Sequence, residues 1–345
     1  MKRIGAALIG YGVAGKCFHA PFLTGLPSFE LRGILVRTSK GLLPNVRYYT
    51  DLEELIKDSV DVVVIATPPE SHYSLGIKLI NAGKNIVIDK PFTCTASEGE
   101  ELILAAKAKG VLLSVYQNRR WDSGFKTVKK LIKSKALGKI VEYSSRFDRW
   151  RPERNVGKWR EQGGPGTGVI FDIGSHLIDQ ALHLFGSPQS VRANVFTLNP
   201  ERPTDDFFEI TFRYSDFIAK LRASSFVSSP FPHFEIHGTE ASFLKFDLDP
   251  QEEKLKRDGV FTESSEWGKE SSDRNGKLYR MNNGKREEVI IQTENGSYQS
   301  FYEGVAAAIH GGGKTPVPGE EALKVIEMIE HCKKSANSGT EIFCK

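Results

Sequence analysis

The opening of the chain constrains its fold more than any other stretch. A short apolar run, Ile4–Ile9, stops at the hexapeptide Gly10-Tyr11-Gly12-Val13-Ala14-Gly15, and a helical stretch follows. In that context the first glycine permits a tight turn, the second lets the backbone approach a pyrophosphate, and the third allows close packing of helix on strand. Free amides at the helix start attract phosphates. A glycine-rich turn without a ligand has the same pattern in isolation, so the surrounding sequence must decide.

Strand and helix patterns alternate through the first third of the chain. We expect strands at residues 30–36, 61–66, 85–88 and 111–116, and helices at residues 51–57, 70–82 and 97–109. This alternation predicts an α/β fold whose first domain, residues 1–120, is a doubly wound parallel Rossmann sheet. Ligands of such sheets lie at the carboxyl ends of the strands. The dinucleotide contacts expected there are Gly10, Gly12, Val13, Ala14, Thr67, Pro68, His72, Asp89 and Lys90.

The end of the second expected strand bears on the choice of cofactor. A carboxylate about 20 residues past the glycines normally accepts the ribose hydroxyls of NAD. This strand instead ends Val36-Arg37-Thr38-Ser39. Arg37 can bind a 2′-phosphate through two hydrogen bonds, and Thr38 can donate another, so the pattern favours NADP. The alternative is that Arg37 is a solvated strand-end residue and that NAD is used as well.

Composition restricts the remaining partners. With a net charge of +4 over 345 residues, the chain offers no strong field for nucleic acid or an anionic membrane, and small polar substrates are the natural ligands. Its four cysteines are scattered without C-x-x-C spacing, which favours free thiols in the cytoplasm. We identify neither a signal peptide nor an apolar run of membrane-spanning length.

The pattern changes after residue 120, which indicates a second α+β domain over residues 121–345. Apolar residues alternate along Phe208–Tyr214 and again along Phe217–Ala223, as expected for a large, mostly antiparallel open sheet with one face on a core. The other face is solvated or forms a subunit contact, and we expect a homodimer or homotetramer through this sheet. The polar stretch Asp247–Glu288 is predicted to form surface excursions with little regular structure.

A polar stripe marks the helix that follows the glycine-rich segment 163–168. At 100° per residue, Asp172, His176, Asp179 and His183 fall within about 60° of one another, and the helix is expected to end at Gly186. The stripe is a solvated face, a metal site or a set of catalytic groups. Histidines at i and i+4 suit a metal, but no convincing third ligand accompanies them, so we predict none.

Taken together, these motifs resemble the glucose-fructose oxidoreductase, inositol dehydrogenase and rhizopine catabolism (Gfo/Idh/MocA) superfamily. The glycine loop, Asp89-Lys90-Pro91 as a variant of the family's E-K-P signature, and Asp172-x-x-x-His176 occur in the family's order and spacing. Five further segments resemble the branch of NADP-dependent scyllo-inositol dehydrogenases. They are Gln117–Asp122, Phe147–Pro152, Trp159-Arg160-Glu161, Asp249–Glu252 and Asn295–Tyr298.

The resemblance implies roles that ordinary chemistry supports. His176 is expected to exchange the hydroxyl proton as base and acid, because histidine titrates near neutrality. Lys90 would hydrogen-bond the reacting oxygen, and Asp172 would bind a neighbouring hydroxyl or orient the pair. Trp159 and Arg160 contact the cofactor or only support their loop. The substrate contacts expected from the resemblance are Asn118, Arg149, Asp172 and Tyr298.

Two departures from the family put the fine substrate preference in doubt: Asp89 stands where Glu is usual, and Gln117 where relatives often carry His. The leading expectation is hydride transfer between nicotinamide and a cyclic polyol or sugar, with scyllo-inositol and inosose as the first pair. Another sugar-derived ketone or dicarbonyl is the alternative within enzymes. A non-catalytic NAD(P)-sensing regulator is the alternative outside them.

Overall fold

The computed structural model describes residues 2–37, 43–154, 157, 159–311 and 313–344. These residues form two compact units, each assembled from three stretches of chain. The first unit comprises residues 1–118, 251–267 and 297–324, and the second comprises residues 119–250, 268–296 and 325–345. In the described part of the chain, no helix is both long and apolar enough to cross a membrane.

A parallel sheet forms the centre of the first unit. In the described residues it has six strands in the order β3-β2-β1-β4-β5-β6. The strands are β1 (Ile4–Ile9), β2 (Phe29–Leu35), β3 (Arg47–Tyr49), β4 (Val62–Ile65), β5 (Asn85–Asp89) and β6 (Leu113–Tyr116). Every residue of β1 and β4 is buried, as expected for strands covered on both faces. The strand order reverses between β1 and β4, which is where ligands of doubly wound sheets bind.

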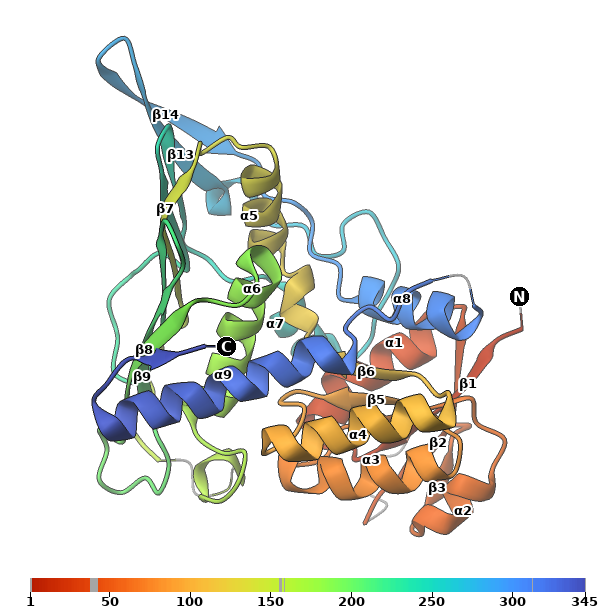
Figure 1. The fold of residues 1–345 in the computed structure, drawn as a ribbon. Helices are drawn as coiled ribbons and strands as arrows, with labels where there is room; N and C mark the ends of the chain where they lie inside the picture. The colour runs from red at the N-terminus through yellow and green to blue at the C-terminus, as the bar shows by residue number, and fades with distance from the viewer. Residues whose placement is uncertain (1, 38–42, 155–156, 158, 312, 345) are drawn as a thin grey trace. The chain divides into compact units, whose positions relative to one another are not determined.

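The helices of this sheet begin and end where local chemistry dictates. They are α2 (Leu52–Lys57), α3 (His72–Asn81) and α4 (Ala96–Lys109), and α3 lies beside α4 (Figure 1). Thr95 and Glu98 form a capping box at the start of α4, and Gly110 ends it with a φ of 64°. Asp51 caps α2 by accepting a hydrogen bond from the backbone of Glu53. The predicted Rossmann sheet is therefore confirmed.

Two later segments pack within the first unit, so the units differ from a simple division at residue 120. They carry α7 (Gln251–Asp258) and α8 (Gln299–Ile309). The reason is aromatic packing on α1 (Ala20–Gly25), where the ring centroid of Phe22 lies 5.0 Å from that of Phe261 and 5.9 Å from that of Tyr302.

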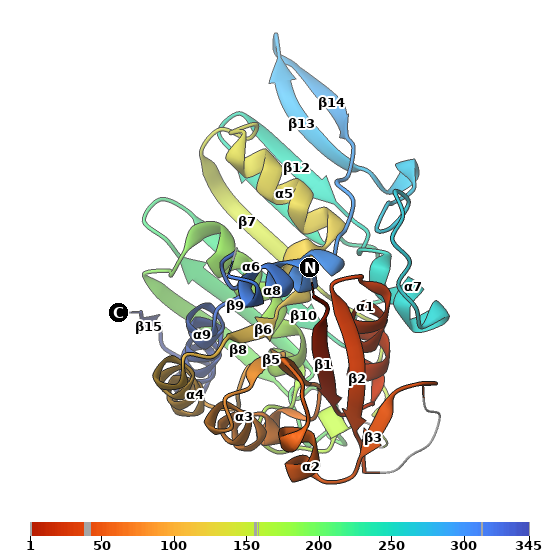
Figure 2. The same cartoon turned by 90° about the vertical axis from the view of Figure 1, so that its right-hand side faces the viewer.

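A large sheet dominates the second unit. Among the described residues it has nine strands in the order β14-β13-β12-β11-β7-β10-β9-β8-β15, antiparallel except between β7 and β10. The strands are β7 (Ile140–Arg146), β8 (Ser190–Phe196), β9 (Phe207–Arg213), β10 (Ile218–Ser224), β11 (Phe234–Gly238), β12 (Ala241–Lys245), β13 (Gly276–Asn282), β14 (Lys285–Ile291) and β15 (Ile342–Phe343). The helices α5 (Ser123–Lys133) and α6 (Ser175–Phe185) lie along one face of it, as both Figure 1 and Figure 2 show. Most of the last helix, α9 (Gly319–Ser338), also belongs to this unit.

The prediction of irregular excursions over residues 247–288 was wrong. This stretch contains α7, β13 and the start of β14, and residues 277–280 of β13 pair with β12. The strand pattern was not recognised because charged residues occupy both strands of the β13–β14 hairpin, where they pair with one another. Arg280 forms an ion pair with Glu287, and Lys277 with Glu288. Polar residues on both strands are thus compatible with a regular hairpin.

Candidate active site

The glycine turn after β1 is tight at its two ends and open in its middle. Gly10 has a φ of 92°, and a Cβ there would lie 2.7 Å from the carbonyl oxygen of Ala66. A side chain at Gly15 would collide with the carbonyl oxygen of Gly10. Gly12, by contrast, is exposed, and a Cβ on it would meet no heavy atom within 4 Å. The turn thus leaves backbone accessible where a pyrophosphate would approach.

The helix after this turn begins irregularly. Residues Gly15–His19 form a π-helix, η1, before α1. The backbone N–H of Lys16 donates to the carbonyl of Gly12 at 2.9 Å, so the turn leads directly into the helix. An exposed glycine backbone at a helix start and at the strand reversal fits the diphosphate of a dinucleotide.

His72 connects the segments that follow β4 and β5. It is fully buried, with Nε2 2.9 Å from the carbonyl oxygen of Thr67. Its Nδ1 lies 3.0 Å from the carbonyl oxygen of Pro91 and 3.2 Å from that of Phe92. Burial lowers the pKa of His72, although the Asp89 carboxylate and the facing carbonyls act against that change. The imidazole therefore contacts the two strand ends, of which one bears Thr67 and Pro68 and the other bears Lys90.

Asp89 and Lys90 follow one another at the end of β5. The carboxylate of Asp89 is buried and accepts a hydrogen bond of 2.9 Å from the backbone N–H of Lys90. It also lies 3.7 Å from Nε2 of His19, whose Nδ1 is 2.6 Å from the hydroxyl of Tyr302. Burial by itself would raise the pKa of Asp89, but His19, Lys90 and His72 together hold it below its usual value. An ionised carboxylate thus lies next to the half-buried Lys90.

The other expected cofactor contacts lie in the glycine turn, after β2 and in the second unit. Val13 is exposed and Ala14 half-buried in the glycine turn, and Arg37 is exposed just after β2. Thr38 lies outside the described residues. In the second unit, Trp159 begins the short helix η4 (Trp159–Glu161).

The four residues of the expected polar stripe have different surroundings in the second unit. Residues Ile170–Gly174 form a π-helix, η5, before α6, so the 100° spacing does not hold between Asp172 and His176. Asp179 forms a buried ion pair with Arg120, and Nε2 of His183 lies 2.8 Å from Nζ of Lys129. Asp179 and His183 thus each lie against a basic residue of another segment.

Asp172 and His176 occupy the start of this helical segment. Oδ1 of Asp172 lies 3.2 Å from Nε of Arg160, and about a quarter of its side chain is exposed. His176 is buried, with 5% of its surface exposed. The segment holds Asp172 in place through a 3.0 Å hydrogen bond from its backbone N–H to the carbonyl of Gly168.

The expected substrate contacts lie in different surroundings. Asn118 is buried at the start of η3 (Asn118–Trp121). The guanidinium of Arg149 lies over the ring of Phe147, 4.4 Å from its centroid. Tyr298 is fully buried, and its backbone N–H donates to Oε1 of Gln251 at 2.8 Å. Among the described residues, no group of three or more His, Cys, Asp or Glu side chains is placed to hold a metal ion.

Sequence reasoning missed three residues that shape this part of the second unit: Arg120, Arg202 and Asp205. Arg120 pairs with Asp179, and the other two lie in the β8–β9 loop. Each forms a hydrogen bond with a partner 35 to 59 positions away in the chain, which no local period signals.

With this geometry established, comparison with known proteins defines the class. The sequence matches the NAD-binding Rossmann fold of the Gfo/Idh/MocA oxidoreductase family over residues 4–117, and the C-terminal alpha/beta domain of the same family over residues 129–343. The chain belongs to this oxidoreductase family, as the resemblance implied.

Individual relatives span nearly the whole chain. It is 39% identical to the scyllo-inositol 2-dehydrogenase (NADP(+)) IolW of Bacillus subtilis, over 97% of this chain and 94% of that protein. It is also 39% identical to the uncharacterized oxidoreductase YdgJ of Escherichia coli, over 95% of each chain. Among solved structures, the oxidoreductase yvaA of Bacillus subtilis matches with a TM-score of 0.95 at 38% identity, covering 100% of this chain and 99% of that one.

Proposed function

We propose that this protein is an NADP-dependent dehydrogenase that oxidises one carbinol of a cyclic polyol to a ketone and also catalyses the reverse reduction. Its first substrate pair would be scyllo-inositol and the corresponding inosose. The observation that carries the proposal is the open glycine backbone at Gly12, together with the Asp89-Lys90 pair at the end of β5 in the same unit. The similarity to IolW supports the choice of polyol and of NADP.

Each reacting group has a separate task in this proposal. A bound nicotinamide would supply the acceptor for the hydride of the carbinol carbon. His176 takes the hydroxyl proton, and returns it in the reverse direction. Lys90 donates a hydrogen bond to the reacting oxygen and offsets the negative charge that develops on it. Asp172 accepts a hydrogen bond from a neighbouring hydroxyl of the ring, which a polyol offers on every side.

Binding roles complete the proposal. Gly10, Gly12, Val13 and Ala14 would hold the diphosphate, and Arg37 with Thr38 the 2′-phosphate of NADP. Thr67, Pro68, His72 and Asp89 would border or position the nicotinamide half, and Trp159 and Arg160 would be further cofactor contacts. Asn118, Arg149 and Tyr298 would contact or shape the polyol pocket.

A substrate panel tests the proposal. Protein is mixed with NADP or NAD and a set of inositols and sugars, or with NADPH or NADH and a set of ketones and dicarbonyls, and the absorbance of the reduced cofactor is followed. We expect scyllo-inositol with NADP to be among the best pairs. Turnover only with a sugar-derived ketone or dicarbonyl would indicate the alternative enzyme, and no turnover with any compound, despite tight NADPH binding, would indicate a nucleotide sensor.

Single replacements separate the roles. Lys90→Met should lower kcat about 100- to 1,000-fold and His176→Asn about 100- to 10,000-fold, because each removes a group needed in the transition state. NADPH binding, followed by its fluorescence, should survive in both. Lys109→Met and His310→Asn are matched controls, since both side chains are exposed. Unchanged turnover in the Lys90 or His176 variant would contradict the assigned role.

A further inference from the structure

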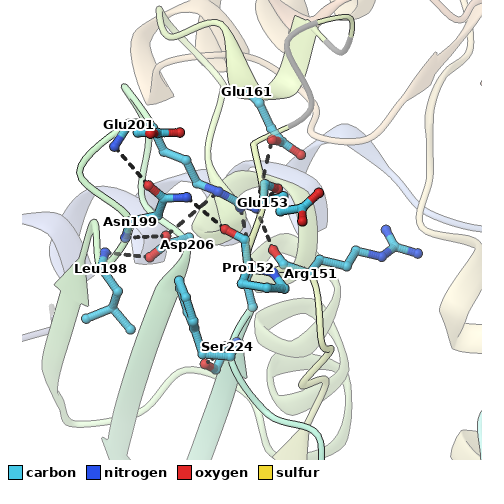
Figure 3. Close-up of polar contacts among 12 residues, drawn as sticks. Arg151, Pro152, Glu153, Glu161, Leu198, Asn199, Glu201, Asp206 and Ser224 are labelled. Atoms are coloured by element: carbon cyan, nitrogen blue, oxygen red, sulfur yellow. Dashed lines mark hydrogen bonds and ion pairs between the residues drawn. The ribbon is translucent and has the colours of Figure 1, made fainter.

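Arg202, in the β8–β9 loop, is surrounded by hydrogen-bond acceptors from distant parts of the chain. Only 6% of the Arg202 side chain is exposed, and its Nη2 donates to the carbonyl oxygens of Arg151 and Glu153, at 2.5 Å each. Nη2 also lies 4.0 Å from a carboxylate oxygen of Glu161. Figure 3 shows Arg151, Glu153 and Glu161 close to one another. Arginine presents five N–H donors in a rigid planar arrangement, whereas the lysine ammonium presents three on a flexible stem.

The loop itself is held in shape by Asp206. This carboxylate is fully buried and accepts hydrogen bonds from the backbone N–H groups of Leu198, at 2.7 Å, and Asn199, at 2.9 Å (Figure 3). Nε of Arg202 lies 3.9 Å from it. The side-chain amide of Asn199 donates in turn to the carbonyl of Pro152 at 2.7 Å. The segment 151–153 is therefore bound to the loop at several points.

The neighbouring residue, Asp205, holds a second segment. Its Oδ2 accepts a 2.7 Å hydrogen bond from the backbone N–H of Ile170, and its carbonyl oxygen accepts one of 3.0 Å from Val169. Gly168, with a φ of 92°, leaves the space that this carboxylate fills, since a Cβ there would collide with it. Burial raises the pKa of Asp205 to about 6, so its carboxyl is desolvated where it meets the helix start.

The two segments held by this loop meet at one ion pair. On one side, Arg202 approaches Glu161, which follows Arg160 in η4; on the other, the segment held by Asp205 continues into η5, which bears Asp172. Nε of Arg160 lies 3.2 Å from Oδ1 of Asp172, and the backbone N–H of Gly168 donates to the carbonyl of Arg160 at 3.4 Å. One loop thus braces both sides of the pair.

We propose that Arg202 and Asp205 are positioning residues that set the Arg160–Asp172 ion pair. The inference rests on the proposed function, in which Arg160 contacts the cofactor and Asp172 the polyol. Neither positioning residue touches a reactant in this proposal. Their effect arises because a displacement of about 1 Å in a binding group lowers a rate about 100-fold.

Matched variants test this inference. Arg202→Met removes the guanidinium group, and Arg202→Lys keeps a positive charge without the planar guanidinium. Asp205→Ala removes the acceptor for Ile170, whereas Asp205→Asn keeps one. We expect Arg202→Met and Asp205→Ala to lower kcat/KM for the polyol about 100-fold, mainly through KM, and Asp205→Asn to recover most of the loss. Glu201→Gln, an exposed charge of the same loop, should leave both parameters unchanged.

A double-mutant cycle distinguishes positioning from a general loss of stability. In a background of Arg160→Met, adding Arg202→Met should raise KM little further, since the first change has already removed the group being positioned. A merely structural role would lower the melting temperature yet leave KM of the folded enzyme unchanged. Fully additive effects on KM in the cycle would overturn the inference.

NADPH binding keeps this test independent of turnover. If the wild-type protein oxidises no polyol, the proposed function fails, but Arg202→Met and Arg202→Lys should still raise the Kd for NADPH about tenfold through Arg160. If turnover is present and the folded Arg202 and Asp205 variants keep the wild-type KM and Kd, the inference fails while the proposed function stands.

Discussion

The guanidinium of Arg120 and the carboxylate of Asp179 form a buried pair with two hydrogen bonds, from Nε at 2.8 Å and from Nη2 at 2.6 Å. Only 6% and 2% of the two side chains are exposed. The pair joins the start of the second unit to α6, one turn beyond His176. Asp179 thus has a buried ion-pair partner in Arg120.

Removing the Asp179 carboxylate should therefore destabilise the protein. Asp179→Ala leaves the Arg120 charge buried, and we expect the free energy of unfolding to fall by about 3–5 kcal/mol in urea titrations. Lys107→Ala is the control, because the Lys107–Glu320 pair is largely exposed and such pairs contribute about 0–1 kcal/mol. A variant of wild-type stability that had lost all turnover would assign Asp179 to catalysis instead.

The raised pKa of Asp205 predicts how stability depends on pH. The folded carboxyl titrates at about 6 and the unfolded one near 3.8, so between these values the folded state binds more protons. The contribution of this group is therefore present below the unfolded pKa and is lost as pH rises, by up to about 1.4 kcal/mol per pH unit. Relative to wild type, Asp205→Asn should gain about 2 kcal/mol between pH 4 and pH 6. Parallel stability curves for the two proteins would show that Asp205 has an ordinary pKa.

Arg37 should determine the preference for NADP. A hydrogen-bonded contact to a charged group contributes about 1.5–3 kcal/mol, so Arg37→Ala should raise KM for NADP about 10- to 100-fold and leave KM for NAD nearly unchanged. Steady-state kinetics with both cofactors measure this, with the exposed Arg192→Ala as the control. Equal effects on both cofactors would mean that Arg37 does not contact the 2′-phosphate.

The outer face of the nine-stranded sheet is our expected subunit contact. Phe196 is 51% exposed and stacks on Phe207, with ring centroids 5.9 Å apart. We expect a homodimer or homotetramer in sedimentation experiments, and a monomer after Phe196→Glu. Leu104→Glu, on an exposed surface of α4, should leave the assembly intact. A wild-type protein that sediments as a monomer would contradict this expectation.

Local patterns were sufficient for the parallel sheet of the first unit but not for the polar stripe or for the hairpin of β13 and β14. The Rossmann sheet was predictable because buried strands such as β4 are continuous apolar runs between helical periods. The polar stripe was not, because a π-turn between Asp172 and His176 changes the angular spacing that the prediction assumed. Charge pairs such as Arg280–Glu287 concealed β13 and β14.

Contacts between distant residues account for the other omissions. Arg120, Arg202 and Asp205 have roles that depend on partners far along the chain, and a sequence read locally gives no sign of them. The fold class and the family motifs could be predicted from the residues alone. The contacts that hold the Arg160–Asp172 pair could be found only in the three-dimensional structure.

Hydride transfer to NADP is the central claim, and isotope tracing tests it most directly. Scyllo-inositol deuterated at its ring carbons is incubated with the wild-type protein and NADP, and the reduced cofactor is examined by mass spectrometry. We predict one deuterium in each molecule of reduced nicotinamide, with the inosose as co-product. Reduced cofactor without deuterium, or none formed while the protein binds NADPH, would contradict the account.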